Sequence, residues 1–241
     1  MRVKKVGDLY QLTFMPRFFP VSCYLLERKD ELVLIDAALP YSTKAILQTA
    51  AKIGKPITNL ILTHAHSDHI GALDDLKAAI PGLNVSISAR DSLLLKGDAS
   101  LQPGEPDSPI RGGVPKKIKT KPDFLLEEGD RIGSLEVIFT PGHTPGSISL
   151  YDVHSQFLIA GDAFHTRGGM AVSGTLKLLF PFPALATWNK QSALESAVKL
   201  RNLHPKLLAV GHGRMVADPL EAMDKAIWKG EKKLESVKTL E

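Results

Sequence analysis

The stretch Thr63-His64-Ala65-His66-Ser67-Asp68-His69 decides the interpretation of this sequence, because it places three imidazoles and a carboxylate within six residues. The apolar run Asn59 to Leu62 before it predicts a strand, and the helical spacing of apolar residues from Asp68 to Ile80 predicts a helix. In an extended segment, residues two apart face the same side, so His64 and His66 can bind one metal ion. Asp68 and His69, at the opening of the helix, can turn towards a second ion.

The ligand types indicate which metals suit such a site. Neutral imidazole and carboxylate favour Zn²⁺, and the carboxylate oxygen leaves Mn²⁺ and Fe²⁺ as alternatives. A purely structural cluster is disfavoured, because so many polar groups at one turn would have no apolar packing role.

Three later turns each add one candidate ligand directly after a predicted strand. His143 lies in the Pro- and Gly-rich loop 141–146, whose tight turns can present it outward. Asp162 follows the apolar run 157–159, and His212 stands between two glycines after the last predicted strand. All of these turns can open on one edge of the fold.

Together these motifs resemble the metallo-β-lactamase-fold hydrolase superfamily, over about residues 10 to 215. The resemblance implies two divalent metal ions, with these ligand sets: His64, His66 and His143 for the first ion; Asp68, His69 and His212 for the second; and Asp162 bridging both. It implies hydrolysis by a metal-activated hydroxide, with Asp68 or a metal-bound water helping to protonate the leaving group. The motifs are specific for the fold and the metal site but weak for the substrate.

The order of predicted elements gives the fold class. The first group of strands comprises residues 9–14, 22–26, 32–35, 59–62 and 84–88, and the second comprises 131–132, 135–139, 147–151, 157–159 and 207–210. Helices are expected at 42–53, 68–80, 91–95 with Asp91 as a possible cap, 187–203, and after Asp218. Two strand groups with helices predict an α/β fold, a four-layer α/β/β/α sandwich of two mixed β-sheets flanked by helices.

Length and composition bound the remaining possibilities. The 241 residues favour a single domain, 1–241, with loop or lid segments near 97–122 and 166–188. A net charge of +4 tilts the protein towards anionic ligands but is too mild and dispersed to predict nucleic-acid binding. The lone Cys23 cannot form an internal disulfide, and no apolar run makes a signal or membrane segment, so we expect a cytoplasmic protein without a membrane partner.

Residues beyond the ligands bear on the substrate. His165 stands three residues after Asp162, near the position where the lactonases that this chain resembles often carry a substrate-contacting tyrosine, so a catalytic or supporting role is predicted. Asp36, after the strand 32–35, is either an acceptor for a ligand imidazole or a buried capping carboxylate. The apolar segment 168–188 either lines the pocket or packs against the sheet or a second subunit of a homodimer.

The predicted substrate is therefore a small anionic or carbonyl-containing molecule, cleaved at an ester, lactone or thioester bond. Phosphodiesterase and β-lactamase activities are alternatives on the same fold. From a different reaction class comes a mononuclear iron enzyme that oxidises persulfides, using part of the same ligand set. A binding protein without catalysis is disfavoured because no ligand position is degraded.

Overall fold

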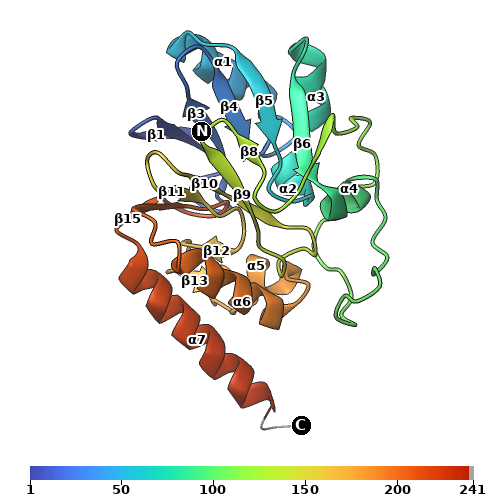
Figure 1. The fold of residues 1–241 in the computed structure, drawn as a ribbon, viewed down its shortest axis with the longest axis vertical. Coiled ribbons are helices and arrows are strands. Elements are labelled where there is room, and N and C mark those ends of the chain that lie inside the picture. Colours follow the sequence, from blue (N-terminus) through green and yellow to red (C-terminus); the bar gives the residue numbers. More distant parts are fainter. Residues whose placement is uncertain (239–241) are drawn as a thin grey trace. The chain divides into compact units, whose positions relative to one another are not determined.

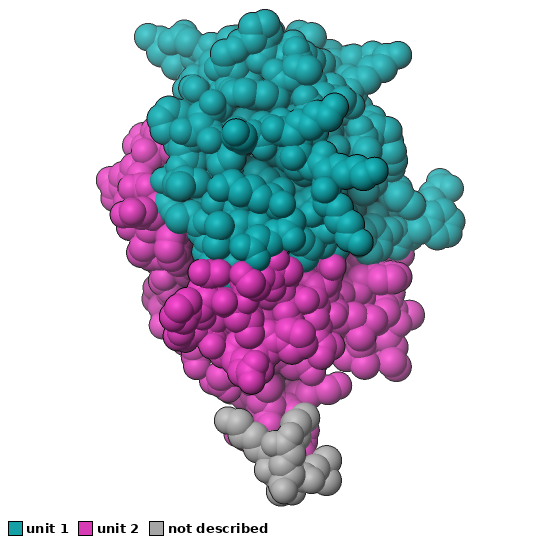
Figure 2. All heavy atoms as spheres, turned by 90° about the vertical axis from the view of Figure 1, so that its right-hand side faces the viewer, with its two compact units in different colours: residues 1–98, 113–126 teal, residues 99–112, 127–241 magenta. Residues whose placement is uncertain are grey.

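The computed structural model describes residues 1–238, and the chain divides into two compact units (Figures 1 and 2). Unit 1 comprises residues 1–98 and 113–126, and unit 2 comprises residues 99–112 and 127–241. The single domain expected from the chain length stays a prediction.

Unit 1 is built on a mixed sheet in the order β1-β2-β3-β4-β5-β6-β7. Its strands are β1 (Arg2–Val6), β2 (Leu9–Phe14), β3 (Val21–Glu27), β4 (Leu32–Ile35), β5 (Ile57–Ile61), β6 (Asn84–Ser88) and β7 (Phe124–Leu126). The pairs from β1 to β4 are antiparallel, and those from β4 to β7 are parallel. Every residue of β4 is buried, as expected for a central strand covered on both faces.

The helices of unit 1 follow the predicted order with two corrections. They are α1 (Thr43–Ile53), α2 (Ser67–Ile70), α3 (Leu73–Ala79) and α4 (Ala89–Leu95). The helix expected at 68–80 is divided, because a Cβ at Gly71 would lie 2.6 Å from Pro40 and the Gly71 amide donates to the Ala38 carbonyl. The cap of α4 is Ser88 rather than Asp91, since the Ser88 hydroxyl accepts from the Asp91 amide at 3.1 Å.

Unit 2 contains a second mixed sheet, in the order β15-β14-β11-β10-β9-β8, and the hairpin β12-β13. Its strands are β8 (Arg131–Ile132), β9 (Leu135–Phe139), β10 (Ile148–Asp152), β11 (Phe157–Ile159), β12 (Phe164–His165), β13 (Ala171–Val172), β14 (Leu207–Ala209) and β15 (Val216–Ala217). Strands β11 and β14 are parallel, and the other pairs in this sheet are antiparallel. The predicted α/β class with mixed sheets and helices is confirmed in both units.

The helices of unit 2 are α5 (Phe182–Ala186), α6 (Lys190–Arg201) and α7 (Leu220–Lys238). The helix expected from Thr187 begins later, because the Asn189 side chain caps α6 by accepting from the Ser192 amide at 2.9 Å. The segment 166–188 was expected to be a loop, but it contains the short elements β13 and α5. By contrast, the described residues 96–123 contain no helix or strand, as predicted for most of 97–122.

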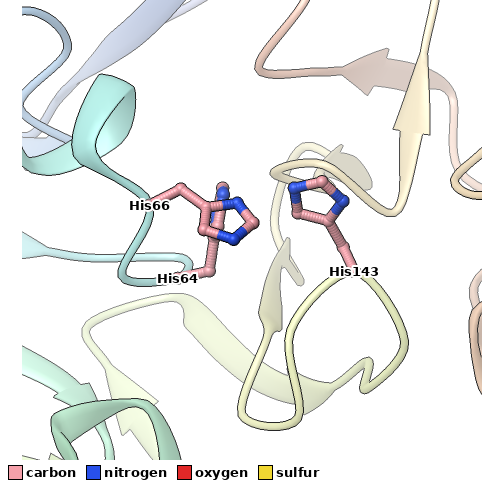
Figure 3. A group of neighbouring side chains, drawn as sticks. All are labelled: His64, His66 and His143. Atoms are coloured by element: carbon pink, nitrogen blue, oxygen red, sulfur yellow. The ribbon is translucent and has the colours of Figure 1, made fainter. Parts of the chain in front are cut away.

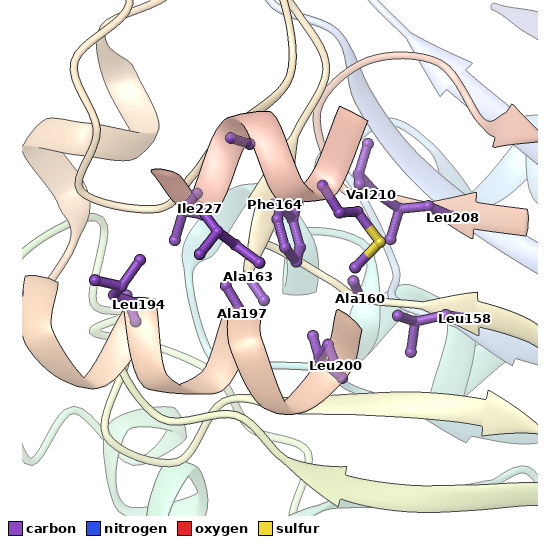
Figure 4. Close-up of a cluster of buried hydrophobic side chains, with 14 of the residues drawn as sticks. Leu158, Ala160, Ala163, Phe164, Leu194, Ala197, Leu200, Leu208, Val210 and Ile227 are labelled. Carbon is purple, nitrogen blue, oxygen red and sulfur yellow. The ribbon is translucent and has the colours of Figure 1, made fainter. Parts of the chain in front are cut away.

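A buried apolar cluster joins the helices of unit 2 to its sheet (Figure 4). Leu194 and Leu200 of α6 pack with Ile227 of α7 over the strand residues Leu158 and Leu208. Each such side chain contributes about 1.5–3 kcal/mol when it is buried. The cluster thereby holds β11 and β14 side by side, and both strands run into candidate ligands.

Candidate metal centre

The turn after β5 gathers the histidines of unit 1. The ring centroids of His64 and His69 are 4.2 Å apart, and those of His64 and His66 are 4.9 Å apart. Figure 3 shows the imidazoles of His64 and His66 leaving the same turn. All three rings are buried. The clustering that the spacing predicted is present within this unit.

A buried carboxylate, Asp36, supports this turn from the end of β4. Its backbone adopts the left-handed region (φ 60°), which costs energy for a residue other than glycine. The Asp36 carboxylate accepts hydrogen bonds from the Thr63 amide at 2.7 Å and the Thr63 hydroxyl at 2.8 Å. Its Oδ2 also lies 2.9 Å from Nδ1 of His69. Asp36 thus holds the turn through Thr63 and lies beside a candidate ligand imidazole, as expected for the first of its two alternative roles, whereas the residue that caps the following helix is Ser42.

The contact with Asp36 selects which nitrogen of His69 can bind a metal ion. When Nδ1 donates to the carboxylate, Nε2 carries the free lone pair, and the ring is held in one orientation. Asp68 lies beside it, with Oδ2 3.9 Å from the Nε2 of His69, and its side chain remains partly exposed. That position suits the role predicted for Asp68 at the edge of the site.

A second buried carboxylate, Asp91, was missed by sequence reasoning except as a helix cap. Its Oδ2 accepts a hydrogen bond of 2.9 Å from the amide of Ala65, which stands between His64 and His66. Asp91 is fully buried at the start of α4. The order of the elements could have predicted this contact. Strands β5 and β6 are parallel neighbours, so the residues that follow their carboxyl ends meet at one edge of the sheet.

In unit 2, His143 is presented by the loop between β9 and β10 (Figure 3). The preceding Gly142 has φ 141°, and a Cβ there would lie 2.3 Å from the Ala193 backbone. Only glycine permits this approach of the loop to α6. The carbonyl of His143 accepts from the Trp188 amide at 3.0 Å. The backbone of His143 is thereby held by the segment that leads into α6.

Two hydroxyl groups lie beside the Nδ1 atom of His143. Ser173 Oγ lies at 3.3 Å and Thr187 Oγ1 at 3.4 Å. The Nε2 atom faces Oδ2 of Asp162 at 3.4 Å. With hydroxyl groups beside Nδ1 and a carboxylate facing Nε2, His143, like His69, is expected to bind a metal ion through Nε2.

Asp162 and His212 meet because their strands are parallel neighbours. They follow β11 and β14, and His212 Nε2 lies 3.1 Å from Asp162 Oδ2. The adjacent Gly213 has φ 130°, and a Cβ there would lie 2.1 Å from the Thr166 hydroxyl oxygen. Asp162 therefore faces two imidazoles, a position suited to a carboxylate shared between metal ions.

His165 lies in β12 and is almost fully buried. Its Nδ1 lies 3.3 Å from the Arg167 carbonyl oxygen, which requires Nδ1 to donate. Burial lowers the pKa of His165 to about 4, against the opposing charge of Asp162. The ring is therefore neutral near pH 7. Its predicted catalytic role stays a prediction.

The other histidines and the cysteine are as expected. His154 and His204 are exposed, as predicted for surface residues. Cys23 is buried, and burial raises the pKa of its thiol far above the ordinary range. It is therefore an inert core residue. Across residues 1–238, no helix combines the length and apolarity needed to cross a bilayer.

The donor set fits divalent metal ions. Each of the seven predicted ligands belongs to a group of histidine and aspartate residues that could hold a metal ion. Six of them are buried, and only Asp68 is partly exposed. Buried imidazoles facing carboxylates, with outer partners that orient the rings, are typical of metal sites in proteins.

Comparisons with known proteins agree with this geometry. The family model described as the metallo-beta-lactamase superfamily matches residues 16–212. The protein YobT of Bacillus subtilis (strain 168) is 54% identical over 96% of this chain and 100% of its own length. The probable metallo-hydrolase YflN of the same organism is 33% identical over 75% of each chain. The crystal structure of TTHA1623 in a di-iron-bound form is similar, with TM-score 0.66, 28% identity, and coverage of 88% of this chain and 96% of that one.

Proposed function

The chain belongs to the metallo-beta-lactamase superfamily, with its fold of mixed β-sheets and flanking helices, and we propose that it is a dinuclear metal-dependent hydrolase. We propose further that it cleaves an ester, lactone or thioester bond in a small anionic or carbonyl-containing substrate. The observation that carries the proposal is the buried carboxylate of Asp162 facing His212 at 3.1 Å and His143 at 3.4 Å. A protein without a metal function would gain little from burying these polar groups together.

The ligands divide by unit. Unit 1 supplies His64, His66, Asp68 and His69, and unit 2 supplies His143, Asp162 and His212. In this proposal His64, His66 and His143 hold one ion, Asp68, His69 and His212 hold the other, and Asp162 is shared. When bound, divalent ions lower the pKa of a coordinated water to about 7 and polarise the carbonyl group under attack. Zn²⁺ is our first choice of metal, with Mn²⁺ and Fe²⁺ as alternatives.

The residues of the chain have distinct parts in this reaction. Asp36 holds the His69 ring through Nδ1, so that Nε2 stays directed at the metal position. Asp68, the more exposed carboxylate, is placed to carry a proton towards the leaving group. His165 does not act as a cation near pH 7, because its lowered pKa of about 4 keeps the ring neutral. A neutral Nε2 in this position can accept a hydrogen bond from substrate.

The preference for a substrate with an apolar part rests on Phe180. Its ring is buried, and its centroid lies 5.4 Å from that of His212 and 6.0 Å from that of His165. Phe180 thus forms an apolar wall beside one of the candidate ligands. Such a wall favours acyl groups over sugar phosphates.

Metal analysis combined with a hydrolysis panel tests the proposal. Protein purified without chelator is assayed for metal ions per chain and for turnover of lactones, esters, thioesters and phosphodiesters. Two divalent ions per chain with turnover of a carbonyl substrate is the expected result. One iron ion with oxygen uptake and no hydrolysis would instead identify the persulfide-oxidising class. Metal-free protein from metal-supplemented cells would overturn both.

A further inference from the structure

The turn Lys177-Leu178-Leu179-Phe180 in unit 2 exposes two leucines at its tip. It is closed by a hydrogen bond of 2.9 Å from the Phe180 amide to the Lys177 carbonyl. The side chains of Leu178 and Leu179 are 90% and 83% exposed. The central positions of a turn ordinarily carry glycine, proline, asparagine, aspartate or serine. A turn that presents two leucines to solvent is therefore unusual.

The last residue of this turn, Phe180, is buried and holds the turn in place. Phe180 is 1% exposed, and its ring lies 5.4 Å from that of Phe182 and 5.4 Å from that of His212. The chain also approaches closely at Gly168, where a Cβ would lie 3.3 Å from the Cβ of Leu179. The two leucines are thus held outward by a packed base.

Four lysines come from this turn and from helices α6 and α7, and we refer to them as the lysine cluster: Lys177, Lys190, Lys229 and Lys233. Lys190 and Lys233 line the same small cavity of about 40 Å³, together with Gly174 and Thr175 just before the turn. Burial, and then the charge of Lys229, lower the pKa of Lys177, which places those two ammonium groups near each other. The cluster therefore combines residues from the turn, α6 and α7.

The lysine cluster lacks counterions within the described part of the chain. None of its members forms an ion pair with a residue among 1–238, whereas two other lysines of α7 do: Lys225 with Glu221, and Lys232 with Glu235 at 2.8 Å. Like charges that form no ion pairs repel each other and attract an anionic partner. The partner that complements the lysine cluster is therefore negatively charged.

We propose that the exposed leucine turn and the lysine cluster together form a docking surface for an anionic lipid membrane. The leucines enter the boundary between headgroups and acyl chains, and the ammonium groups lie against lipid phosphates. A second copy of the chain fits less well, because a two-fold contact would place the lysine cluster against itself.

This proposal departs from the expectation that the protein has no membrane partner. That expectation rested on the lack of an apolar segment long enough to span a bilayer, a criterion that does not detect surface binding. The leucines and lysines that make the surface are spread over more than fifty residues of sequence and meet only in the folded chain.

Flotation with lipid vesicles tests the proposal directly. The full chain is mixed, without substrate, with vesicles of phosphatidylcholine alone or of equal parts phosphatidylcholine and phosphatidylglycerol. The protein is expected to float with the anionic vesicles only, and binding should fall as salt is added. Since no hydrolysis is measured, failure of this test is separate from failure of the proposed function.

Three double variants locate the surface. Leu178→Ser/Leu179→Ser and Lys229→Glu/Lys233→Glu are each expected to weaken binding to anionic vesicles by about tenfold or more. The matched control is Lys116→Glu/Lys117→Glu in unit 1, which brings the net charge from +4 to zero just as the α7 variant does, at exposed lysines elsewhere. This control is expected to bind like the wild type.

Each contrary outcome rejects the proposal. Binding of the leucine variant at the wild-type level would show that the turn does not enter the membrane. Equal loss in the control and the α7 variant would show attraction by net charge alone. Equal binding to both kinds of vesicle, or to neither, would exclude an anionic lipid partner. Circular dichroism of each variant verifies that it is folded.

Discussion

The two sets of candidate ligands are built in opposite ways. In unit 1 they come from one continuous turn, His64 to His69, which two buried carboxylates hold in place. In unit 2, His143, Asp162 and His212 come from three separate loops, held by close backbone approaches at Gly142 and Gly213.

The difference lies in how each set is kept rigid. Asp36 and Asp91 supply charged hydrogen-bond acceptors, which make stronger bonds than neutral hydroxyls. Beside Nδ1 of His143 lie the neutral hydroxyls of Ser173 and Thr187. The outer partners of the unit 1 ligands are therefore carboxylates, whereas those beside Nδ1 of His143 in unit 2 are hydroxyls, and substitutions in each unit can compare the two.

The largest effect is expected from removing one ligand of each set. We expect His66→Ala and Asp162→Ala each to lose metal and hydrolysis together. The loss should exceed the factor of about 100 that accompanies loss of an outer partner of a metal ligand. Elemental analysis and turnover of the best substrate measure it, and His154→Ala, at an exposed histidine, serves as the control. Full activity without bound metal in either variant would contradict the assignment.

The steric basis of unit 2 is tested at Gly142. We expect Gly142→Ala to lower the free energy of unfolding by about 3 kcal/mol or more, because the added Cβ overlaps the backbone of Ala193 at 2.3 Å. The matched control is Gly54→Ala, which also has positive φ (83°) but meets nothing within 4 Å, and should cost about 1 kcal/mol. Urea denaturation measures both, and equal losses would show that backbone strain, not the close approach, is what matters.

The charged support of unit 1 is tested at Asp36. We expect Asp36→Asn to weaken metal binding by about 10 to 100-fold, because the His69 ring loses a charged acceptor at 2.9 Å. For Ser173→Ala, which removes a neutral hydroxyl near His143, we expect less than about tenfold. Competition with a chelator measures the affinity of both variants. An equal effect of the two substitutions would remove the contrast between the units.

The smallest effect concerns His165 and pH. Its folded pKa of about 4 lies below the value of about 6.5 in an unfolded chain, so the unfolded state binds the proton first as the pH falls. Stability is therefore lost between about pH 6.5 and pH 4, and the loss reaches about 1.4 kcal/mol at pH 5.5. We expect His165→Gln to lack this part of the pH dependence of the unfolding free energy. Parallel pH profiles of wild type and variant would show that His165 is not buried as a neutral ring.

Sequence patterns predicted the strands best where apolar runs were closed by polar or turn residues. The bounds expected for 9–14, 32–35, 84–88 and 157–159 match the structure. Other strands, such as β1 (Arg2–Val6) and β15 (Val216–Ala217), were missed, because neither carries an apolar run of its own. Such strands are defined by pairing with a neighbour rather than by their own pattern.

Helix bounds failed where a distant residue intervened. The periodicity from Asp68 to Ile80 is continuous, yet Gly71 packs against Pro40 and the helix is divided there. Asp91 looked like a cap, but its side chain bonds to the Ala65 amide instead. Local propensity cannot register a partner that lies 26 residues away in sequence.

By itself the sequence predicted a candidate set of metal ligands, because imidazoles and carboxylates at these spacings have few other uses. It also determined the α/β class, since strand and helix periodicities are local. Only the tertiary structure decided which carboxylates support the ligands, where glycine is obligatory, and that the segment just before the leucine turn lines a cavity with lysines of α6 and α7. These depend on contacts between segments far apart along the chain, and the packing of the folded core alone brings those segments together.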